Sequence, residues 1–275
     1  MKFWKAFVFG AIILSGLFLG CTKEIDIELE EGDRRLVIES WFTTEEKVHE
    51  IRLTETANYF SNEPTPKASG ATVQISGGGE VFPFSEVSPG IYHSAPSAKA
   101  SLGTQYTLSV VFEGELYEAQ DYCDSVPSLN QVELYPSYDA ENNLSGYDFL
   151  IWTKELSGYG HYYCWRIKRN GEYLTDTLSE ITIESDEYLG DGLEFNAFPI
   201  DYISINEVNS GDTLTLEQHN ISKQTYDAFI GILSETEWKG GIFDTPPANI
   251  PSNVNNNGLG VFVVSAMVKK SVIVP

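Results

Sequence analysis

Cys21 is the residue whose position most directly predicts chemistry. It follows an apolar run from Phe7 to Leu19 that is preceded by Lys2 and Lys5. A run of this length is too short to span a bilayer and has the anatomy of a cleaved signal peptide. A cysteine directly after it, preceded by a small residue, is the one that lipoprotein-processing enzymes acylate. We therefore expect removal of residues 1–20 and lipid attachment at Cys21; the alternative is ordinary secretion with a cysteine there by chance.

Catalytic motifs are missing from the rest of the sequence. It contains no GxSxG, no HExxH and no phosphate-binding loop, and its four histidines are scattered. His49 and Glu50 are adjacent, but the second histidine of a zinc motif does not follow them. Since there are 40 acidic residues, a chance pair of carboxylates is uninformative about glycosidase chemistry. We expect no enzymatic activity and no cofactor.

Two acidic loops offer the best metal ligands. Because their donors are oxygen atoms, calcium is the ion that they would favour. Neither loop has the glycine spacing of an EF-hand, so we interpret both as solvated loops and expect no metal. The two candidate sets are Asp186, Glu187 and Asp191, and Asp139, Glu141 and Asn143.

The aromatic string Tyr162, Tyr163 and Trp165 could form a carbohydrate platform or part of a core. In a strand, alternate residues face opposite sides, so Tyr163, Trp165 and Ile167 share one face while Tyr162 and Arg166 share the other. Large apolar side chains on one face are most simply explained by burial. We expect Tyr163, Trp165 and Ile167 to lie in a core.

Cys123 and Cys164 are the other two cysteines. An exported protein meets an oxidising compartment, where two such residues can pair. A disulfide between them would join the two halves of the chain, but their side chains could equally point apart. The sequence leaves both arrangements open.

Residues 34–125 predict an Ig-like or prealbumin-like β-sandwich. Apolar residues alternate with polar ones in seven short segments, and turn residues separate these segments. Glu113-Gly114 predicts a tight hairpin. Tyr106 lies where a tyrosine often anchors a corner of such a sandwich, although a plain core position fits as well.

Residues 126–275 predict a second β-rich domain with one helix. Further strands are expected, among them 201–208 and 259–270, and Asn170-Gly171 predicts a hairpin turn. Ser222 can cap a helix at about 222–238, in which apolar residues recur at helical spacing. The irregular segment 244–258 is long enough to be either functional or packed over the core. Residues 21–33 are short and acidic, which is typical of a tether between a lipid and a domain.

Charge restricts the partners. The full chain has a formal net charge of −23, and loss of Lys2 and Lys5 with residues 1–20 lowers it to −25. Such a surface repels nucleic acid and anionic headgroups. No later apolar run is long enough to cross a bilayer, so we expect membrane attachment through N-terminal acyl chains alone.

The mature sequence resembles the Bacteroidota lipoproteins grouped as domain of unknown function 4249. The resemblance is carried by CTKEIDIEL, RRLVIESWFTT, GIYHSA and LGTQYTLSVVFEGELYEA in the first half. In the second half it is carried by HYYCWRIKRNGEYL, ISKQTYDAFIGIL and IFDTPPANIPSNVNNNGLGVFVVSAM. It implies an outer-membrane, lipid-anchored protein whose relatives are often encoded beside TonB-dependent transporters. It implies no established activity. Separately, Lys23-Glu24-Ile25-Asp26 after Cys21 is loosely similar to a surface-export signal. We therefore expect surface display; the alternative is a lipoprotein that faces the periplasm.

Three Asp-Ser/Thr-apolar triplets resemble the O-glycosylation pattern of exported Bacteroidota proteins. They centre on Ser125, Thr177 and Thr213, all near ends of predicted strands. Our principal hypothesis is a non-catalytic accessory or ligand-binding lipoprotein that works with a TonB-dependent transporter. The alternatives are a structural or adhesion protein of the cell surface and, third, a hydrolase.

Overall fold

The computed structural model describes residues 33–57, 63–174, 177–189, 191–236 and 250–275. Arg34–Pro275 form one compact unit. The predicted signal peptide, Cys21 and the tether up to residue 32 lie outside the described residues. Within the described part, no helix is both long and apolar enough to cross a membrane.

Seven strands make up the first half, as the alternation of apolar residues predicts, and the mainly β fold is confirmed. They are short because turns built on glycine, proline and polar residues interrupt them. The strands are β1 (Leu36–Thr43), β2 (Glu50–Glu55), β3 (Thr72–Gly77), β4 (Glu80–Ser88), β5 (Ile91–Ser94), β6 (Thr104–Phe112) and β7 (Glu115–Cys123).

The second half adds eight strands and the expected long helix. The strand predicted at 201–208 is misplaced, because β13 starts earlier and passes through two irregular registers against β9 that hide its alternation. The elements are β8 (Leu129–Tyr138), β9 (Leu144–Lys154), β10 (Tyr162–Arg169), β11 (Glu172–Tyr173), η2 (Leu178–Glu180), β12 (Thr182–Ser185), α2 (Asp186–Leu189), β13 (Glu194–Ser204), β14 (Thr213–Ile221), α3 (Lys223–Thr236) and β15 (Leu259–Ile273).

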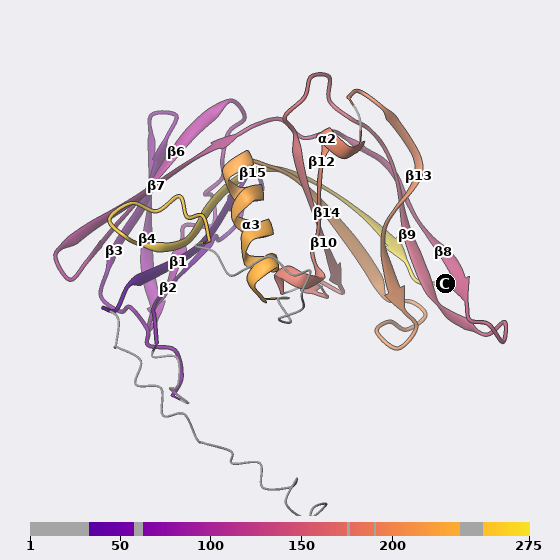
Figure 1. Cartoon of the computed structure of the whole chain (residues 1–275), viewed down its shortest axis with the longest axis horizontal. Helices are drawn as coiled ribbons and strands as arrows, with labels where there is room; N and C mark the ends of the chain where they lie inside the picture. The colour runs from indigo at the N-terminus through magenta and orange to yellow at the C-terminus, as the bar shows by residue number, and fades with distance from the viewer. Residues whose placement is uncertain (1–32, 58–62, 175–176, 190, 237–249) are drawn as a thin grey trace, which may run out of the picture. The chain divides into compact units, whose positions relative to one another are not determined.

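A 12-stranded sheet runs through both halves of the chain (Figure 1). Its order is β11-β10-β14-β15-β1-β2-β5-β4-β3-β6-β7, and β12 also pairs with β10. β8, β9 and β13 form a separate three-stranded sheet. The predicted boundary at 125/126 therefore does not separate two sheets, because β15 pairs in parallel with β1 and antiparallel with β14.

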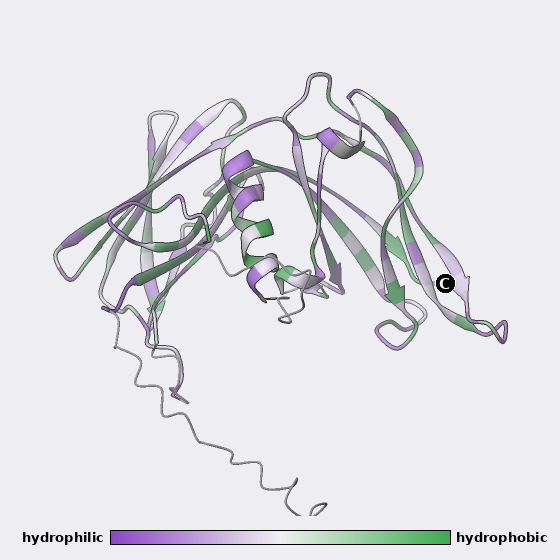
Figure 2. Cartoon of the chain, in the orientation of Figure 1, coloured by the Kyte–Doolittle hydropathy of each residue, from purple (hydrophilic) through white to green (hydrophobic). Residues whose placement is uncertain are grey.

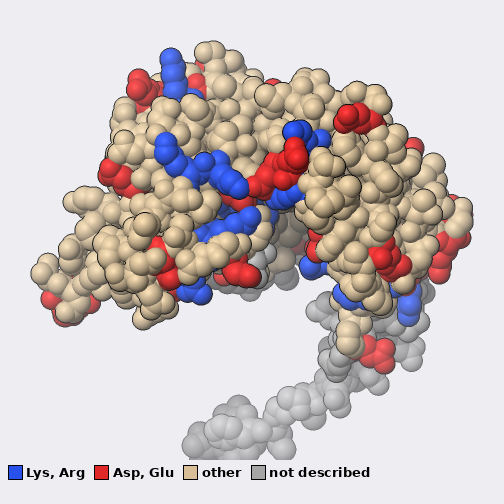
Figure 3. Space-filling view, turned by 180° about the vertical axis from the view of Figure 1, so that it is seen from behind, with Lys and Arg blue, Asp and Glu red and all other residues tan. Residues whose placement is uncertain are grey.

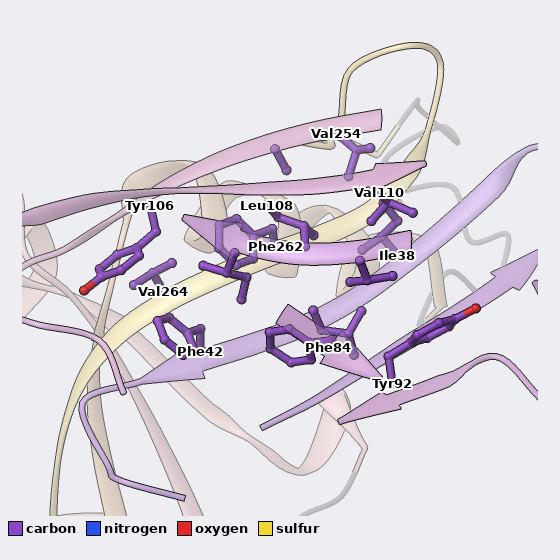
Figure 4. Packing of buried hydrophobic residues seen from close by; sticks show 14 of the residues in the cluster. Ile38, Phe42, Phe84, Tyr92, Tyr106, Leu108, Val110, Val254, Phe262 and Val264 are labelled. Atoms are coloured by element: carbon purple, nitrogen blue, oxygen red, sulfur yellow. The ribbon is translucent and has the colours of Figure 1, made fainter. Parts of the chain in front are cut away.

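β15 contributes to all three hydrophobic cores. Phe262 and Val264 pack in the first core with β1 to β7, and Val268 packs against the second core between β10, β14 and the three-stranded sheet. Val261 and Val263 face the third core, beneath α3. Figure 2 shows the resulting alternation of hydrophobic and hydrophilic residues along the strands, and Figure 4 shows Phe262 and Val264 among the aromatic and aliphatic side chains of the first core.

Gly260 permits the junction between β1 and β15. Its φ of +90° lies in the region that favours glycine, and an added Cβ would collide with the backbone of Ile38. A side chain at this position would push the two parallel strands apart.

Three local predictions are confirmed. Glu113 and Gly114 both have positive φ between β6 and β7, as do Asn170 and Gly171 between β10 and β11, which is the geometry of tight hairpin turns. The Tyr106 hydroxyl accepts a hydrogen bond from the Ser101 N–H at 2.8 Å while its ring is buried. Tyr106 is therefore a corner tyrosine as well as a core residue.

α3 starts as predicted. The Ser222 Oγ accepts a hydrogen bond from the Thr225 N–H, which caps the helix. The helix buries Ala228 and Phe229 in the third core, whereas Ile230 is exposed. Residues 237 and 238 of the predicted helix lie outside the described residues.

Candidate functional site

A cavity of about 600 Å³ lies between the sheet and the elements that cover it, α3 and η2. Its size is in the range of small-molecule binding sites. Val261 and Val263 of β15 and Phe229 of α3 supply buried apolar lining, and Trp41 of β1 adds an aromatic surface. Exposed charged residues of the lining are Glu39, Glu50 and Arg52.

Alternation along β1 and β2 explains why the cavity has both apolar and charged walls. Ile38 and Ile51 point into the first core, so Glu39, Trp41 and Arg52 face the opposite side of the sheet. Glu39 and Arg52 are cross-strand partners. The same pattern that builds the first core therefore lines the cavity.

Arg166 is the basic residue of this cavity that comes from β10. Its guanidinium carbon lies 3.7 Å from the ring centroid of Tyr173 and 4.9 Å from that of Trp41. These distances fit cation–π contact, which a planar guanidinium makes readily. Its buried Nε atom has no hydrogen-bond partner, and among the described residues no carboxylate lies within ion-pair distance.

Several other basic side chains of the described part are paired with acids. Lys47 and Lys269 both contact Glu45, and Lys99 contacts Glu46. Figure 3 shows how basic side chains gather beside acidic ones on the face seen from behind. Arg166 differs from these residues because it offers a partly buried positive charge without an acidic partner.

A buried polar network adjoins Arg166 on the same face of the sheet. Glu217 Oε1 accepts a hydrogen bond from Lys168 Nζ at 2.7 Å, and Oε2 accepts one from the Tyr173 hydroxyl at 2.8 Å. Burial by itself would raise the pKa of Glu217, but the hydrogen bonds and charge of its neighbours, Lys168 and Tyr173 among them, outweigh it and hold this pKa well below its ordinary value. Glu217 therefore forms its ion pair with Lys168 and not with Arg166.

Ser265, His219 and Glu217 lie next to one another in space, in the serine–histidine–acid arrangement of a hydrolase catalytic triad. Ser265 Oγ lies 3.0 Å from His219 Nδ1 and accepts a hydrogen bond from the Trp41 indole at 2.8 Å. His219 Nε2 is 3.8 Å from Glu217, too far for a hydrogen bond. Burial lowers the pKa of His219. Because Ser265 is fully buried, this arrangement presents no nucleophile to a substrate.

Of the two arrangements that the sequence leaves open for Cys123 and Cys164, the structure has the one without a disulfide. Both cysteines are free. Cys123 packs in the first core and Cys164 in the third, because their strands turn these residues toward different interiors. Burial raises the pKa of each thiol to about 12.

The aromatic string behaves as expected of core residues. Tyr163, Trp165 and Ile167 pack together in the second core. Tyr162 faces the third core on the other side of the sheet, where its ring lies 4.9 Å from that of Tyr226. The string is therefore divided between two interiors.

The predicted modification positions lie at the surface. Ser125 and Thr177 are exposed and Thr213 is half-buried. Asp124 accepts a hydrogen bond from the Ser125 N–H, and Asp212 accepts hydrogen bonds from Asn170 and Asn209 at the turn beside Thr213. These contacts leave O-glycosylation a prediction.

The acidic loops are organised differently from calcium loops. Asp139 accepts backbone hydrogen bonds from Glu141 and Asn143, so it closes a turn. Asp186 and Asp191 are separated, since Asp191 binds the Gly158 N–H while Asp186 lies beside His161.

The sequence by itself did not single out Arg166 as a lining residue of the cavity, or Glu155 as a neighbour of His161 and Asp186. For Arg166, the sequence showed only a basic residue on the less apolar face of the strand that carries Tyr163 and Trp165. The residues around Arg166 and those around Glu155 come from distant parts of the sequence, so neither the cavity nor the Glu155 cluster can be recognised from one segment.

The family model described as "Domain of unknown function (DUF4249)" matches residues 22–271, and the chain belongs to this family. No curated protein matches it. Among solved structures, one match is a chain from "Cytokine receptor complex - Crystal form 1A", which is 10% identical with a TM-score of 0.24. The match covers 86% of this chain and 94% of that one, and a likeness this weak carries no argument.

Proposed function

We propose that this member of the DUF4249 family is a lipid-anchored, non-catalytic binding protein of the Bacteroidota outer membrane that works with a TonB-dependent transporter. Its ligand would occupy the cavity beneath α3. The observation that carries the binding role is Arg166, a guanidinium in a cavity with apolar and charged walls that has no carboxylate at ion-pair distance among the described residues. Membrane anchoring rests on the apolar run that ends at Cys21.

The lining favours a small ligand with an apolar body and one anionic group. Trp41, Phe229 and Val263 would contact the apolar body, while Arg166 would pair with the anion. Hydrogen bonds to a charged, partly desolvated group are stronger than neutral ones. The overall negative charge of the protein would disfavour anions elsewhere on its surface.

Binding can be tested with 8-anilinonaphthalene-1-sulfonate, which has an aromatic body and one sulfonate. We expect saturable binding at one site of the purified full chain and a change in tryptophan fluorescence, because Trp41 lines the cavity. Arg166→Met should weaken binding about tenfold, the loss of one charge-assisted contact. Arg34→Met is the control, because Arg34 is exposed and does not line the cavity.

Equal binding by the Arg166→Met and Arg34→Met variants, with both folded, would refute the proposed site. Stronger binding by Arg166→Met would refute the anion preference as well.

Anchoring and the transporter role need measurements in cells. Cys21→Ser should move the protein to the soluble fraction and abolish labelling with a fatty-acid analogue. Crosslinking in intact cells should capture a large outer-membrane transporter. If the protein stays in the membrane in the Cys21→Ser variant, the acyl anchor is refuted. If no transporter is captured and deletion leaves nutrient uptake intact, the adhesion hypothesis takes precedence.

A further inference from the structure

Glu155, His161 and Asp186 bring three potential metal ligands together away from the cavity. Glu155 follows β9, His161 precedes β10, and Asp186 begins α2. One ligand atom from each residue lies within 4.8 Å of the other two. β12, which pairs with β10, delivers Asp186 to the start of β10.

The distances fit a metal site. His161 Nδ1 lies 3.1 Å from Glu155 Oε1 and 3.3 Å from Asp186 Oδ2. Ligand atoms that share a zinc ion at bonds of about 2.0–2.1 Å are separated by roughly 3.3 Å in tetrahedral coordination. The two carboxylates already approach the same imidazole nitrogen at nearly this separation.

Burial and charge make a cation favourable at this position. The side chains of Glu155 and Asp186 are 1% and 0% exposed, and among the described residues neither has a Lys or Arg partner. His161 Nδ1 carries at most one hydrogen, yet it faces both acidic groups. Two buried carboxylates around one imidazole therefore lack a full countercharge, which a divalent ion would supply.

Hydrogen-bond donors surround the carboxylates as they do in metal centres. The Tyr163 hydroxyl donates to Glu155 Oε1 at 2.8 Å, and the Gly192 N–H donates to Oε2. The Gly160 and His161 N–H groups donate to Asp186. Such outer contacts orient metal ligands and tune their affinity.

We propose that Glu155, His161 and Asp186 form a zinc site, with Zn²⁺ bound by His161 Nδ1 and one oxygen from each carboxylate. An imidazole nitrogen favours zinc over calcium, while the two carboxylates supply the remaining protein ligands. His161 is 15% exposed, so water can complete the coordination. Binding would tie the start of β10 to α2 and to the end of β9.

Isothermal titration of the purified full chain, after chelator treatment and dialysis, tests this site with ZnCl₂ and, in parallel, with CaCl₂. We expect one zinc per chain and at least tenfold weaker calcium binding. His161→Gln, Glu155→Gln and Asp186→Asn should each weaken zinc binding at least tenfold. Tyr163→Phe should weaken it about tenfold through the lost outer contact. X-ray absorption should show one imidazole and oxygen ligands.

Asp191→Asn is the matched control, because this neighbouring carboxylate binds the Gly158 N–H and is not a member of the cluster. It should retain zinc affinity within twofold. Circular dichroism identifies the variants that fold. If the Glu155 and Asp186 variants do not fold, His161→Gln alone tests the site, because His161 is the most exposed of the three residues. The proposal would be overturned if the wild type bound no zinc, or if His161→Gln and Asp191→Asn bound zinc equally well. The choice of ion would be overturned if the wild type bound calcium more tightly than zinc.

Discussion

Glu217 is the residue on which the polar network beneath α3 depends. Its two oxygens accept hydrogen bonds from Lys168 and Tyr173, and its side chain is 1% exposed. Burying two charges costs desolvation free energy, which their mutual attraction offsets. Removal of one partner therefore strongly lowers the free energy of unfolding, because the other charge stays buried without compensation. Substitution of Glu217 therefore tests the network more sharply than substitution of a surface acid.

Glu217→Gln should lower the free energy of unfolding by about 3 kcal/mol near neutral pH, because Lys168 loses its partner. The pKa of Glu217 is lower in the folded than in the unfolded state, so the charged group stabilises the fold above the unfolded value of 4.5. This contribution is lost as the pH falls through the folded pKa.

Urea titrations of the wild type and of Glu217→Gln at neutral and acidic pH measure this difference, which should shrink as the pH is lowered below 4.5. The exposed Glu133 provides the control variant Glu133→Gln. A difference that stays constant, or grows, toward low pH would contradict the assignment.

The two buried thiols give a second prediction for single residues. Since burial raises the pKa of Cys123 and of Cys164 to about 12, neither should react with Ellman's reagent in the folded protein at neutral pH. In guanidinium chloride without reductant, both should react. Failure of both Cys123 and Cys164 to react after unfolding would show that a disulfide joins them.

Asp121 joins three elements at the scale of secondary structure. This residue of β7 accepts hydrogen bonds from Gln224 and Thr225 of α3 and, at 2.7 Å, from the Val264 N–H of β15. Burial raises its pKa, and the hydrogen bonds from neighbouring groups partly offset this effect. Asp121 thus holds the first turn of α3 against the sheet.

Asp121→Ala should destabilise the protein by about 2–3 kcal/mol, because buried donors on β15 and α3 lose their acceptor. Hydrogen exchange should accelerate most in the first turns of α3. Asp227→Ala, which removes an exposed ion pair with Lys223 on the same helix, should destabilise the protein much less than Asp121→Ala, because water and salt screen such a pair. Equal effects of the two substitutions would show that Asp121 does not hold the helix.

β15 unites the whole molecule, because it contributes to all three cores and links the two halves of the large sheet. A junction of this kind favours unfolding in a single transition, since neither half retains a complete core when β15 leaves. The sheet continuity thus predicts cooperative unfolding of Arg34–Pro275.

Gly260→Ala should destabilise both halves together by several kcal/mol, because the added Cβ meets the backbone of Ile38. Hydrogen exchange measured on β6 and on β9 should report the same loss of stability. Gly171→Ala has a similar positive φ but open space around the added Cβ, so it should cost only about 1 kcal/mol. Loss of protection in β6 alone would show that the halves unfold separately.

The sequence by itself determined the local features of this fold. Alternation located most strands, Ser222 marked the start of α3, and Glu113-Gly114 and Asn170-Gly171 marked two hairpins. These features depend on neighbouring residues, whose backbone preferences and side-chain directions act over a few positions. The same reasoning misplaced β13, because two register shifts against β9 interrupt the alternation of its residues.

Only the tertiary structure decided which distant residues meet. Alternation shows which face of β10 carries Arg166, but strand pairing places Trp41 of β1 and Phe229 of α3 around the same cavity. Likewise, the β10–β12 pairing brings Asp186 to His161. A strand's pattern specifies that one face must be buried but not which strand will pair with it, so sites built across strands are fixed by the tertiary structure.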